Sequence, residues 1–207
     1  MRDIMMSALR ASLVTWVLCG IAYPLALTGL GQWLMPVQAN GSLERTPYGA
    51  VIGSRLIGQL WNGPEWFHGR PSATSDTDPN DPTKTVPAPY NAASSGASNL
   101  GPTSKVLLER LLGERVALET TQPEIAGAVL PADMLTTSAS GLDPDISPAN
   151  AALQVARVAR ARRVPLADID ALVERHVTGR SFRIFGEPRV NVLDLNLALQ
   201  RAYPGPD

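Results

Sequence analysis

The N-terminal part of the chain contains one long run without charge. From Ala11 to Leu43 there is no Asp, Glu, Lys or Arg. A helix needs about 20 predominantly apolar residues to cross the hydrocarbon core of a membrane, and residues 11–35 supply that length. The run therefore predicts a single transmembrane helix over 11–35, with a kink near its middle where Pro24 removes a backbone hydrogen bond.

The positive charges beside this run indicate its orientation. Arg2 and Arg10 lie just before it, whereas the next basic residue is Arg45. Because basic segments stay on the cytoplasmic side of a membrane, residues 1–10 are expected to form a cytoplasmic tail. Residues 36–207 then form an extracytoplasmic, periplasmic domain of a single-pass protein in the cell inner membrane.

A cleaved secretory signal is the alternative interpretation of the same run. Val37-Gln38-Ala39 has the small-x-small pattern that a signal peptidase accepts. The apolar part of a signal is about 7–15 residues long, whereas this run continues past Trp16, Tyr23 and Trp33. The length favours a retained anchor.

Composition limits what the exported part can be. The chain has 207 residues and a formal net charge of -1, which gives no electrostatic basis for binding nucleic acid. Its single cysteine, Cys19, lies in the predicted span, so the exported part has neither a disulfide nor a thiol nucleophile. We expect an α+β fold, in which one transmembrane helix precedes one small domain of several helices and a few short strands.

In the first half of the exported part, the sequence pattern predicts few helices or strands. Residues 48–61 mix β-branched and aliphatic side chains with glycines, which predicts one or two short strands. Residues 71–98 contain five prolines and many serines, threonines and alanines, and they predict a long Pro/Ser-rich loop without regular structure. A loop of this length would serve as a contact surface.

Helical periodicity appears in the second half. Ser104 or Thr103 is expected to begin a helix that Gly113 ends, and Ser147 with Pro148 is expected to begin another. A further helix is expected from Pro165 to near Gly179. In residues 190–199 the alternation of apolar residues fits a strand, but Asn191 followed by Asp194 favours a helix start, and helix is the prediction.

Charged residues flank the predicted helix that begins at Ser147. Asp143 and Asp145 are expected to act through turn chemistry and by favouring the helix N-terminus. Four arginines crowd its other end: Arg157, Arg160, Arg162 and Arg163. We expect these arginines to form a solvated helix end, where positive charge is favourable.

Catalytic and metal motifs are not found in the sequence. His68 and His176 are the only histidines and lack the spacing of a zinc site. No Gly-x-Ser-x-Gly elbow of a hydrolase occurs. Residues 96–103 depart from the phosphate-binding loop because Pro102 replaces its lysine. Residues 76–81 begin like a calcium loop but lack its glycine. Neither a catalytic residue nor a metal ligand is therefore predicted.

Several long strings together resemble one known family. They are GSRLIGQLW (53–61), FHGRPSA (67–73), YNAASSGASNLGPTS (90–104), SASGLDPDISPANAALQVARVARAR (138–162) and VNVLDLNLAL (190–199). With the N-terminal span, they resemble the C subunit of the Kdp potassium-transporting P-type ATPase. The resemblance covers nearly the whole chain.

The resemblance implies an accessory, non-catalytic subunit of a high-affinity potassium uptake pump. ATP hydrolysis would reside in a separate catalytic subunit, and the other partners would be a potassium-channel-like subunit and a small membrane subunit. The family is described as a catalytic chaperone that raises the ATP affinity of the pump. The nucleotide-related positions that the resemblance implies are Ser95, Gly96, Ser98, Asn99 and Gln154. Ala97 and Ala139 depart from glycines of the family pattern, which reduces backbone freedom in both loops.

The implied nucleotide role conflicts with the predicted orientation. If Arg2 and Arg10 are cytoplasmic, Ser95 to Asn99 face the periplasm, where ATP is not a working substrate. We therefore expect no stably bound cofactor, with ATP only in complex with the catalytic subunit, and favour a structural role on the channel-like subunit. The alternative function is a membrane-anchored periplasmic enzyme or solute-binding protein that uses residues 71–98 as a lid.

Overall fold

A computed structural model describes residues 1–205 of the chain. It divides into two compact units, Met1–Ser54 and Arg55–Asp207. The compact part of the C-terminal half thus begins at Arg55, about 20 residues after the predicted span ends. The strands that precede Arg55 belong to the N-terminal unit.

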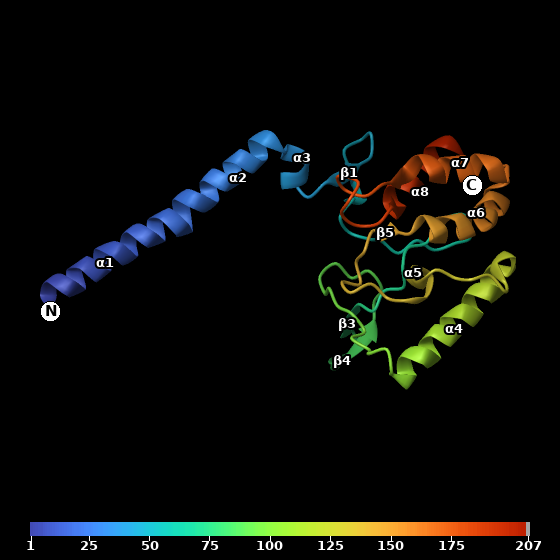
Figure 1. The fold of residues 1–207 in the computed structure, drawn as a ribbon, viewed down its shortest axis with the longest axis horizontal. Coiled ribbons are helices and arrows are strands. Elements are labelled where there is room, and N and C mark those ends of the chain that lie inside the picture. The colour runs from blue at the N-terminus through green and yellow to red at the C-terminus, as the bar shows by residue number, and fades with distance from the viewer. Residues whose placement is uncertain (206–207) are drawn as a thin grey trace. The chain divides into compact units, whose positions relative to one another are not determined.

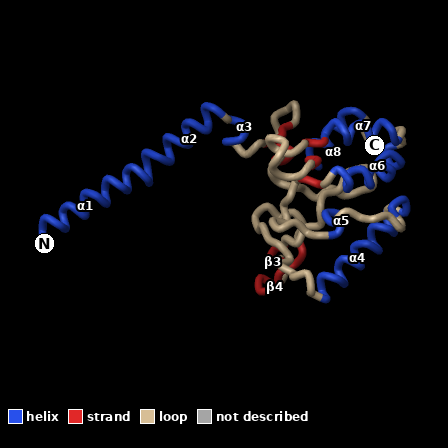
Figure 2. The backbone as a smooth tube through the Cα atoms, in the orientation of Figure 1, coloured by secondary structure: helices blue, strands red, loops and turns tan. Residues whose placement is uncertain are grey.

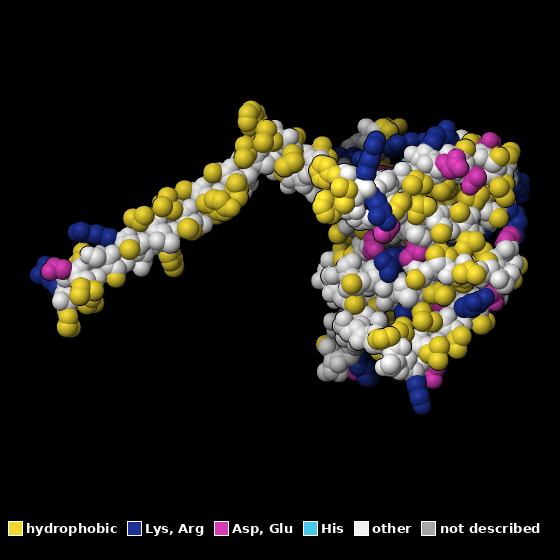
Figure 3. Space-filling model, viewed as in Figure 1, with side chains coloured by type: hydrophobic (Ala, Val, Ile, Leu, Met, Phe, Trp, Pro, Cys, Tyr) yellow, Lys and Arg dark blue, Asp and Glu magenta, His cyan; other side chains and the backbone are white. Residues whose placement is uncertain are grey.

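The N-terminal unit is dominated by one helical rod. Helix α1 (Arg2–Val17) continues through a π-helical turn (Leu18–Ala22) into α2 (Tyr23–Leu34), and the rod is long and apolar enough to cross a membrane. Figure 1 shows this rod, and Figure 3 shows apolar side chains along it with charged side chains at its N-terminal end. The predicted helix is confirmed. Its departure from α geometry lies just before Pro24, as expected where proline cannot donate a backbone hydrogen bond.

A short helix and a hairpin complete this unit. Helix α3 (Pro36–Ala39) is followed by β1 (Leu43–Arg45) and β2 (Val51–Ser54), which pair antiparallel. The prediction of strand structure in residues 48–61 is confirmed for β2.

The core of the C-terminal unit lies between three helices and a small sheet (Figure 2). The helices are α6 (Pro148–Arg162), α7 (Leu166–His176) and α8 (Val192–Ala202). The antiparallel sheet has the order β5 (Asp145–Ile146), β7 (Arg189–Asn191), β6 (Val177–Thr178). Their buried apolar side chains form one cluster: Phe67, Ile146, Ala151, Val155, Val158, Ala159, Ile169, Leu172, Val173, Val190, Val192, Leu195 and Leu199.

The ends of these helices follow the capping signals in the sequence. Ser147 Oγ accepts a hydrogen bond from the Asn150 N–H (3.1 Å), and Asn191 Oδ1 accepts one from the Asp194 N–H (3.1 Å). The predicted starts of α6 and α8 are therefore confirmed. Helix α7 begins after Pro165 as predicted and ends at His176, where the chain enters β6.

The prediction that residues 71–98 lack regular structure is wrong. They contain β3 (Ser75–Asp78) and β4 (Asp81–Pro87), which form an antiparallel hairpin. The carboxylates of Asp78 and Asp81 accept hydrogen bonds from nearby backbone N–H groups (2.8 and 3.1 Å) and build the turn. Both strands of an isolated hairpin have a free edge, so prolines are tolerated there.

Helix α4 (Lys105–Thr121) is longer than predicted. Ser104 caps it as expected, since its side chain accepts from the Leu107 N–H, but the predicted end near Gly113 is wrong. Gly113 lies inside the helix, which continues through the Arg115–Glu119 ion pair (2.9 Å). Every residue of α4 is exposed or half-buried. A 3-10 turn (Pro123–Ile125) and α5 (Ala132–Leu135) connect α4 to the core.

Candidate functional site

The segment Gly63–His68 is held by buried amide side chains from two helices. Asn196 of α8 accepts a hydrogen bond from the Phe67 N–H and donates one to the Phe67 carbonyl, both at 2.9 Å. Gln154 of α6 does the same at His68, with distances of 2.8 and 3.0 Å. Each side chain thus replaces the hydrogen bonds that a neighbouring strand would make.

Two arginines of α6 bind the carbonyl groups of the same segment. Arg157 Nη1 donates to the carbonyl oxygens of Pro64 (2.8 Å), Trp66 (2.9 Å) and Gly63 (3.3 Å), and its Nη2 donates to Gln154 Oε1 (2.6 Å). Charged donors strengthen such bonds. We call Gln154, Arg157, Arg162 and Asn196, together with Gly63–His68, the backbone clamp.

Arg162 completes the backbone clamp at its outer end. Its Nε donates to the Glu65 carbonyl (2.8 Å), and its Nη1 donates to the Tyr203 carbonyl (2.7 Å). Its guanidinium carbon lies 4.4 Å from the centre of the Trp66 ring, which is a cation–π contact. The carbonyls of six consecutive residues, 63–68, are therefore bound by side chains of α6 and α8.

The prediction of a solvated arginine cluster is wrong for two of the four arginines. Arg157 is 2% exposed and Arg162 is 5% exposed, whereas Arg160 and Arg163 are exposed as expected. Burial of a charge is costly unless hydrogen bonds compensate it. Here backbone carbonyls supply that compensation, and they belong to a segment about 90 residues away in sequence.

Burial also lowers the pKa values of three groups in the backbone clamp, Arg157, Arg162 and His68. It lowers the pKa of Arg157 to about 10, partly opposed by the negative charge of Glu65, so the guanidinium remains charged at neutral pH. It likewise lowers the pKa of His68, and the nearby Arg157 charge lowers that pKa further. His68 is therefore neutral at pH 7, with Nε2 2.7 Å from the Gly63 carbonyl.

Four of the five predicted site residues lie on one loop that packs on another. Ser95 Oγ and the Gly96 N–H both donate to the Ser140 carbonyl (2.9 Å), and Ser98 Oγ lies 3.4 Å from the Thr137 hydroxyl. Asn99 has a left-handed backbone (φ 50°). The two loops that depart from the family pattern at Ala97 and Ala139 are thus adjacent.

Gly141 shows how closely these two loops approach. Its φ is 69°, and a Cβ there would lie 2.7 Å from the Gly96 carbonyl oxygen and 2.4 Å from the Thr74 methyl group. Both the conformation and the space require glycine. Loop 95–99 is therefore held against 137–141 by both side-chain and backbone contacts.

Gln154, the fifth predicted residue, lies in a different environment. Its side chain is buried, and its hydrogen bonds go to His68, Asn150 and Arg157, partners that differ from those of loop 95–99. Both its amide oxygen and its amide nitrogen are engaged inside the protein. The structure therefore gives Gln154 a structural role in the backbone clamp.

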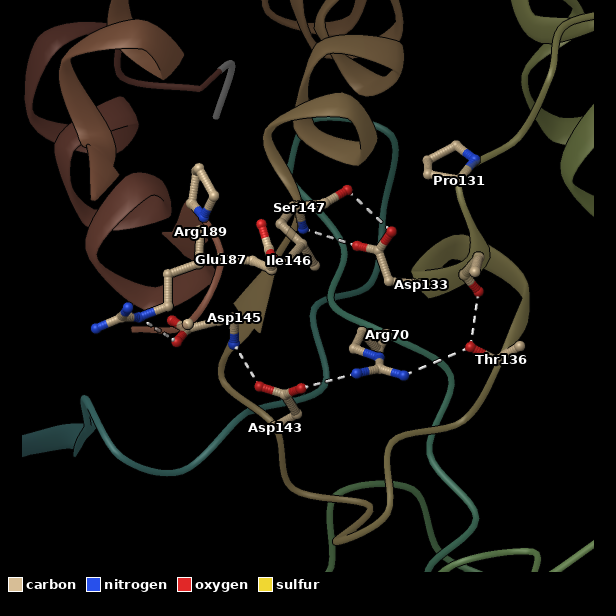
Figure 4. A pocket seen from close by; sticks show the side chains of 13 residues that line it. Arg70, Pro131, Asp133, Thr136, Asp143, Asp145, Ile146, Ser147, Glu187 and Arg189 are labelled. Atoms are coloured by element: carbon tan, nitrogen blue, oxygen red, sulfur yellow. Dashed lines mark hydrogen bonds and ion pairs between the residues drawn. The ribbon is translucent and has the colours of Figure 1, made fainter. Parts of the chain in front are cut away.

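A cavity of about 640 Å³ lies on another side of the C-terminal unit (Figure 4). Arg70, the loop before α6 and the segment 186–189 line it, together with α5. The ionisable residues in its lining are Arg70, Asp133, Asp143, Asp145, Glu187 and Arg189. Sequence reasoning did not identify this cavity, because it forms where four separate segments meet.

Four of the six charged side chains in the lining of the cavity form ion pairs with one another. Arg70 pairs with Asp143 (3.0 Å), and Arg189 pairs with Asp145 (3.0 Å). Asp133 accepts hydrogen bonds from the Ser147 N–H (2.7 Å) and hydroxyl (2.9 Å), and so helps to cap α6. Figure 4 shows these pairs converging from separate elements.

The two aspartates considered in the sequence differ in their roles. Asp143 Oδ1 accepts from the Asp145 N–H (3.0 Å), which is the expected turn chemistry. Burial raises the pKa of the Asp145 carboxyl, and Arg189 and Asn191 partly offset that shift. The helix N-terminus is instead served by Asp133 and Ser147.

The ion pairs of the cavity limit the reactions that its lining residues could catalyse. The Ser147 hydroxyl donates to Asp133 (2.9 Å) as part of the cap of α6, and the lining of the cavity contains neither His nor Cys. Within residues 1–205, no group of three or more His, Cys, Asp or Glu side chains is placed to hold a metal ion. The cavity is a polar surface feature stabilised by its own ion pairs.

Comparisons with known proteins cover almost the whole chain. A family model described as "KdpC: K+-transporting ATPase, c chain" matches residues 5–201. Proteins named "Potassium-transporting ATPase KdpC subunit" are similar along nearly their full length. The one from Bradyrhizobium diazoefficiens is 57% identical over 92% of both chains, and the one from Methylobacterium nodulans is 54% identical over 94% of this chain and 97% of its own.

A third relative extends the match to both ends. The protein of the same name from Rhodopseudomonas palustris is 53% identical over 98% of this chain and 97% of its own. Matches of this identity and coverage include the N-terminal helix, the backbone clamp and the cavity. The chain belongs to the KdpC family of the K+-transporting ATPase.

Proposed function

We propose that the chain is an accessory, non-catalytic subunit of an ATP-driven potassium uptake pump. The observation that carries the proposal is the full-length similarity to proteins named as the KdpC subunit of that ATPase. In this proposal, ATP hydrolysis resides in a separate catalytic subunit. The remaining partners are a potassium-channel-like subunit and a small membrane subunit.

The N-terminal rod supports a membrane anchor. Arg2–Leu34 forms one helix whose apolar side chains are exposed along its length. Exposed apolar surface of this extent is stable in lipid or against other membrane helices. The arginines before residue 11 support an orientation with the N-terminus in the cytoplasm and the C-terminal unit in the periplasm.

The interior of the C-terminal unit supports a structural role. Gln154 uses its amide group inside the backbone clamp, and in loop 95–99 the Ser95 hydroxyl and the Gly96 N–H bind the Ser140 carbonyl. In the proposed orientation both lie away from cytoplasmic ATP. In this proposal the subunit influences ATP affinity only through its contacts with the catalytic subunit, and it binds no cofactor stably by itself.

Deletion of the C-terminal unit tests the proposal. A chain truncated after Ser54 keeps the whole N-terminal unit. Complexes that contain it should assemble in lower yield or transport potassium with lower affinity than complexes with the full chain. Unchanged yield and unchanged potassium affinity would reject the proposal.

Thiol labelling tests the orientation. Val129 is 94% exposed, so a Val129→Cys variant in a Cys19→Ser background offers one accessible thiol. A membrane-impermeant reagent should label it in intact spheroplasts. Labelling only after the membrane is opened would place the C-terminal unit in the cytoplasm and restore direct nucleotide contact as the better proposal.

A further inference from the structure

The hairpin between β6 and β7 exposes apolar side chains that the rest of the unit leaves uncovered. Phe182 is 89% exposed, Ile184 70% and Phe185 66%. All positions from 177 to 189 are exposed. We call residues 180–187 the hairpin tip. Three large apolar side chains within four residues mark a contact surface more often than a chance feature.

The hairpin tip is held in a defined conformation. Ser181 and Phe185 exchange two backbone hydrogen bonds of 2.9 Å, and the Ile184 N–H donates to the Ser181 carbonyl (3.1 Å). Phe182 and Arg183 at the turn have φ of 52° and 63°. Such turns normally use Asn and Gly, because side chains at positive φ are strained. Phe182 and Arg183 are therefore retained at a cost in folding stability.

Positive charge surrounds the apolar side chains. Residues 180–187 contain two arginines and one glutamate, so the net charge of the hairpin tip is +1. Arg180 pairs with Glu187 (2.6 Å), and Arg189 pairs with Asp145 (3.0 Å). Arg183 is exposed at the turn itself, between Phe182 and Ile184. Aromatic and arginine side chains in this mixture are typical of the boundary between lipid headgroups and acyl chains.

We propose that the hairpin tip docks into the anionic headgroup region of the membrane in which the chain is anchored. Phe182, Ile184 and Phe185 enter the boundary with the acyl chains, and Arg183 extends to the lipid phosphates. The positive charge of Arg183 complements the phosphates of anionic lipids. The inference rests on the proposed membrane anchoring of the chain.

Because the chain is tethered to the membrane in this proposal, a contact made by three apolar side chains is sufficient for docking. The spanning helix ends at Leu34 and the C-terminal unit begins at Arg55, so a short connection keeps the unit near the bilayer. A tethered contact acts at a high effective concentration, and weak intrinsic affinity then gives substantial occupancy. Three apolar side chains on a free protein would not give stable membrane binding.

An environment-sensitive dye on the hairpin tip tests the docking. The full chain is reconstituted as Ser181→Cys in a Cys19→Ser background, in vesicles of phosphatidylcholine with or without phosphatidylglycerol. Both leaflets have the same composition, so the orientation of insertion does not affect the readout. The dye emission should shift to the blue with phosphatidylglycerol, and high salt should reverse the shift. A dye at Val129→Cys, which is exposed outside the hairpin tip, should not respond.

Three variants separate the effect of charge from that of apolar contact. Arg183→Gln should lower the ratio of docked to undocked tip about fivefold, since each basic residue near an anionic surface contributes about 1 kcal/mol. Arg183→Lys should keep most of the docking because it keeps the charge. The double variant Phe182→Ser and Phe185→Ser should abolish the blue shift at either lipid composition.

Three results would overturn the proposal, and flotation of the chain with the vesicles tells them apart. A chain that floats but gives no lipid-dependent shift is anchored, yet its hairpin tip does not dock. A shift seen only when the other pump subunits are added assigns the hairpin tip to a protein partner. A chain that does not float refutes the membrane anchoring itself, and with it the docking.

Discussion

The backbone clamp and the hairpin tip place opposite kinds of side chain in unusual surroundings. In the backbone clamp, Arg157 and Arg162 are buried almost completely. In the hairpin tip, Phe182, Ile184 and Phe185 extend into water. Globular proteins usually expose arginines and bury large apolar side chains.

The two regions differ in whether their side chains find contact partners within the same chain. The buried arginines find carbonyl groups within the same chain, in the segment Gly63–His68. The exposed apolar side chains find no such cover among the described residues. Substitutions in the backbone clamp should therefore change folding stability, whereas substitutions in the hairpin tip should change association and leave the fold intact or stabilise it.

Loss of Arg157 should have the largest effect. Arg157→Met leaves the carbonyl oxygens of Pro64 and Trp66 without their donor and removes one of the two donors to the Gln154 amide oxygen, and each buried unpaired group is costly. We expect the free energy of unfolding to fall by about 3 kcal/mol. Urea unfolding of the full chain in mild detergent, followed by tryptophan fluorescence, measures it.

Arg160→Met on the same helix is the matched control. Arg160 is exposed and pairs with Glu124 at the surface, and such pairs contribute about 0–1 kcal/mol. Equal losses for Arg157→Met and Arg160→Met would show that burial of Arg157 does not distinguish it, and the comparison between the two regions would fail.

Replacement of Gln154 or Asn196 should have the next largest effect on the free energy of unfolding. Each binds the N–H and carbonyl of one residue, so Gln154→Ala and Asn196→Ala should each lower the free energy of unfolding by about 2 kcal/mol. Gln154→Glu should lose less than Gln154→Ala, because a carboxylate still accepts from the His68 N–H and from Arg157.

The same pair of variants tests the nucleotide role of Gln154 in the assembled pump. The two alanine variants should reduce pump activity equally when complexes are compared at equal subunit content. A loss of ATP affinity in Gln154→Ala that is absent from Asn196→Ala would contradict a purely structural role. It would instead favour direct contact of Gln154 with nucleotide.

Local signals in the sequence were sufficient to predict most of the helical core. Caps at Ser104, Ser147 and Asn191 lie where the pattern indicates, because a cap depends on residues within one turn. The end of α4 was not predictable in this way. Gly113 is a common helix terminator, but continued helical contacts override its propensity.

The sequence did not predict the backbone clamp, because arginine is a residue type that is usually exposed. Arg162 follows Val155 and Val158 at spacings of seven and four, so its position on α6 is on the buried face. Its charge favours solvent, so the sequence predicted an exposed side chain. The compensating carbonyls come from residues 63–66, which no local pattern connects with α6. Long-range backbone partners are the information that the sequence lacks.

Replacement of the strained turn should have a smaller effect of opposite sign. The double variant Phe182→Asn and Arg183→Gly gives the turn residues that accept positive φ. Since a left-handed conformation costs a non-glycine residue about 1–2 kcal/mol, we expect the free energy of unfolding to rise by about 1 kcal/mol. The same urea titration measures it, and lower stability would show that Phe182 makes folding contacts that its exposure does not indicate.

Titration of His68 should give the smallest effect. Burial lowers its pKa in the folded protein, so on acidification the unfolded chain takes up a proton before the folded one does. The free energy of unfolding should therefore fall as the pH decreases below about 6.5, the ordinary histidine pKa. His68→Gln should remove part of that slope, whereas His176→Gln should leave the part due to His68 in place. Urea titrations between about pH 7.5 and 5.5 measure this slope. An unchanged slope in His68→Gln would mean that the backbone clamp opens enough to admit water and protons to His68.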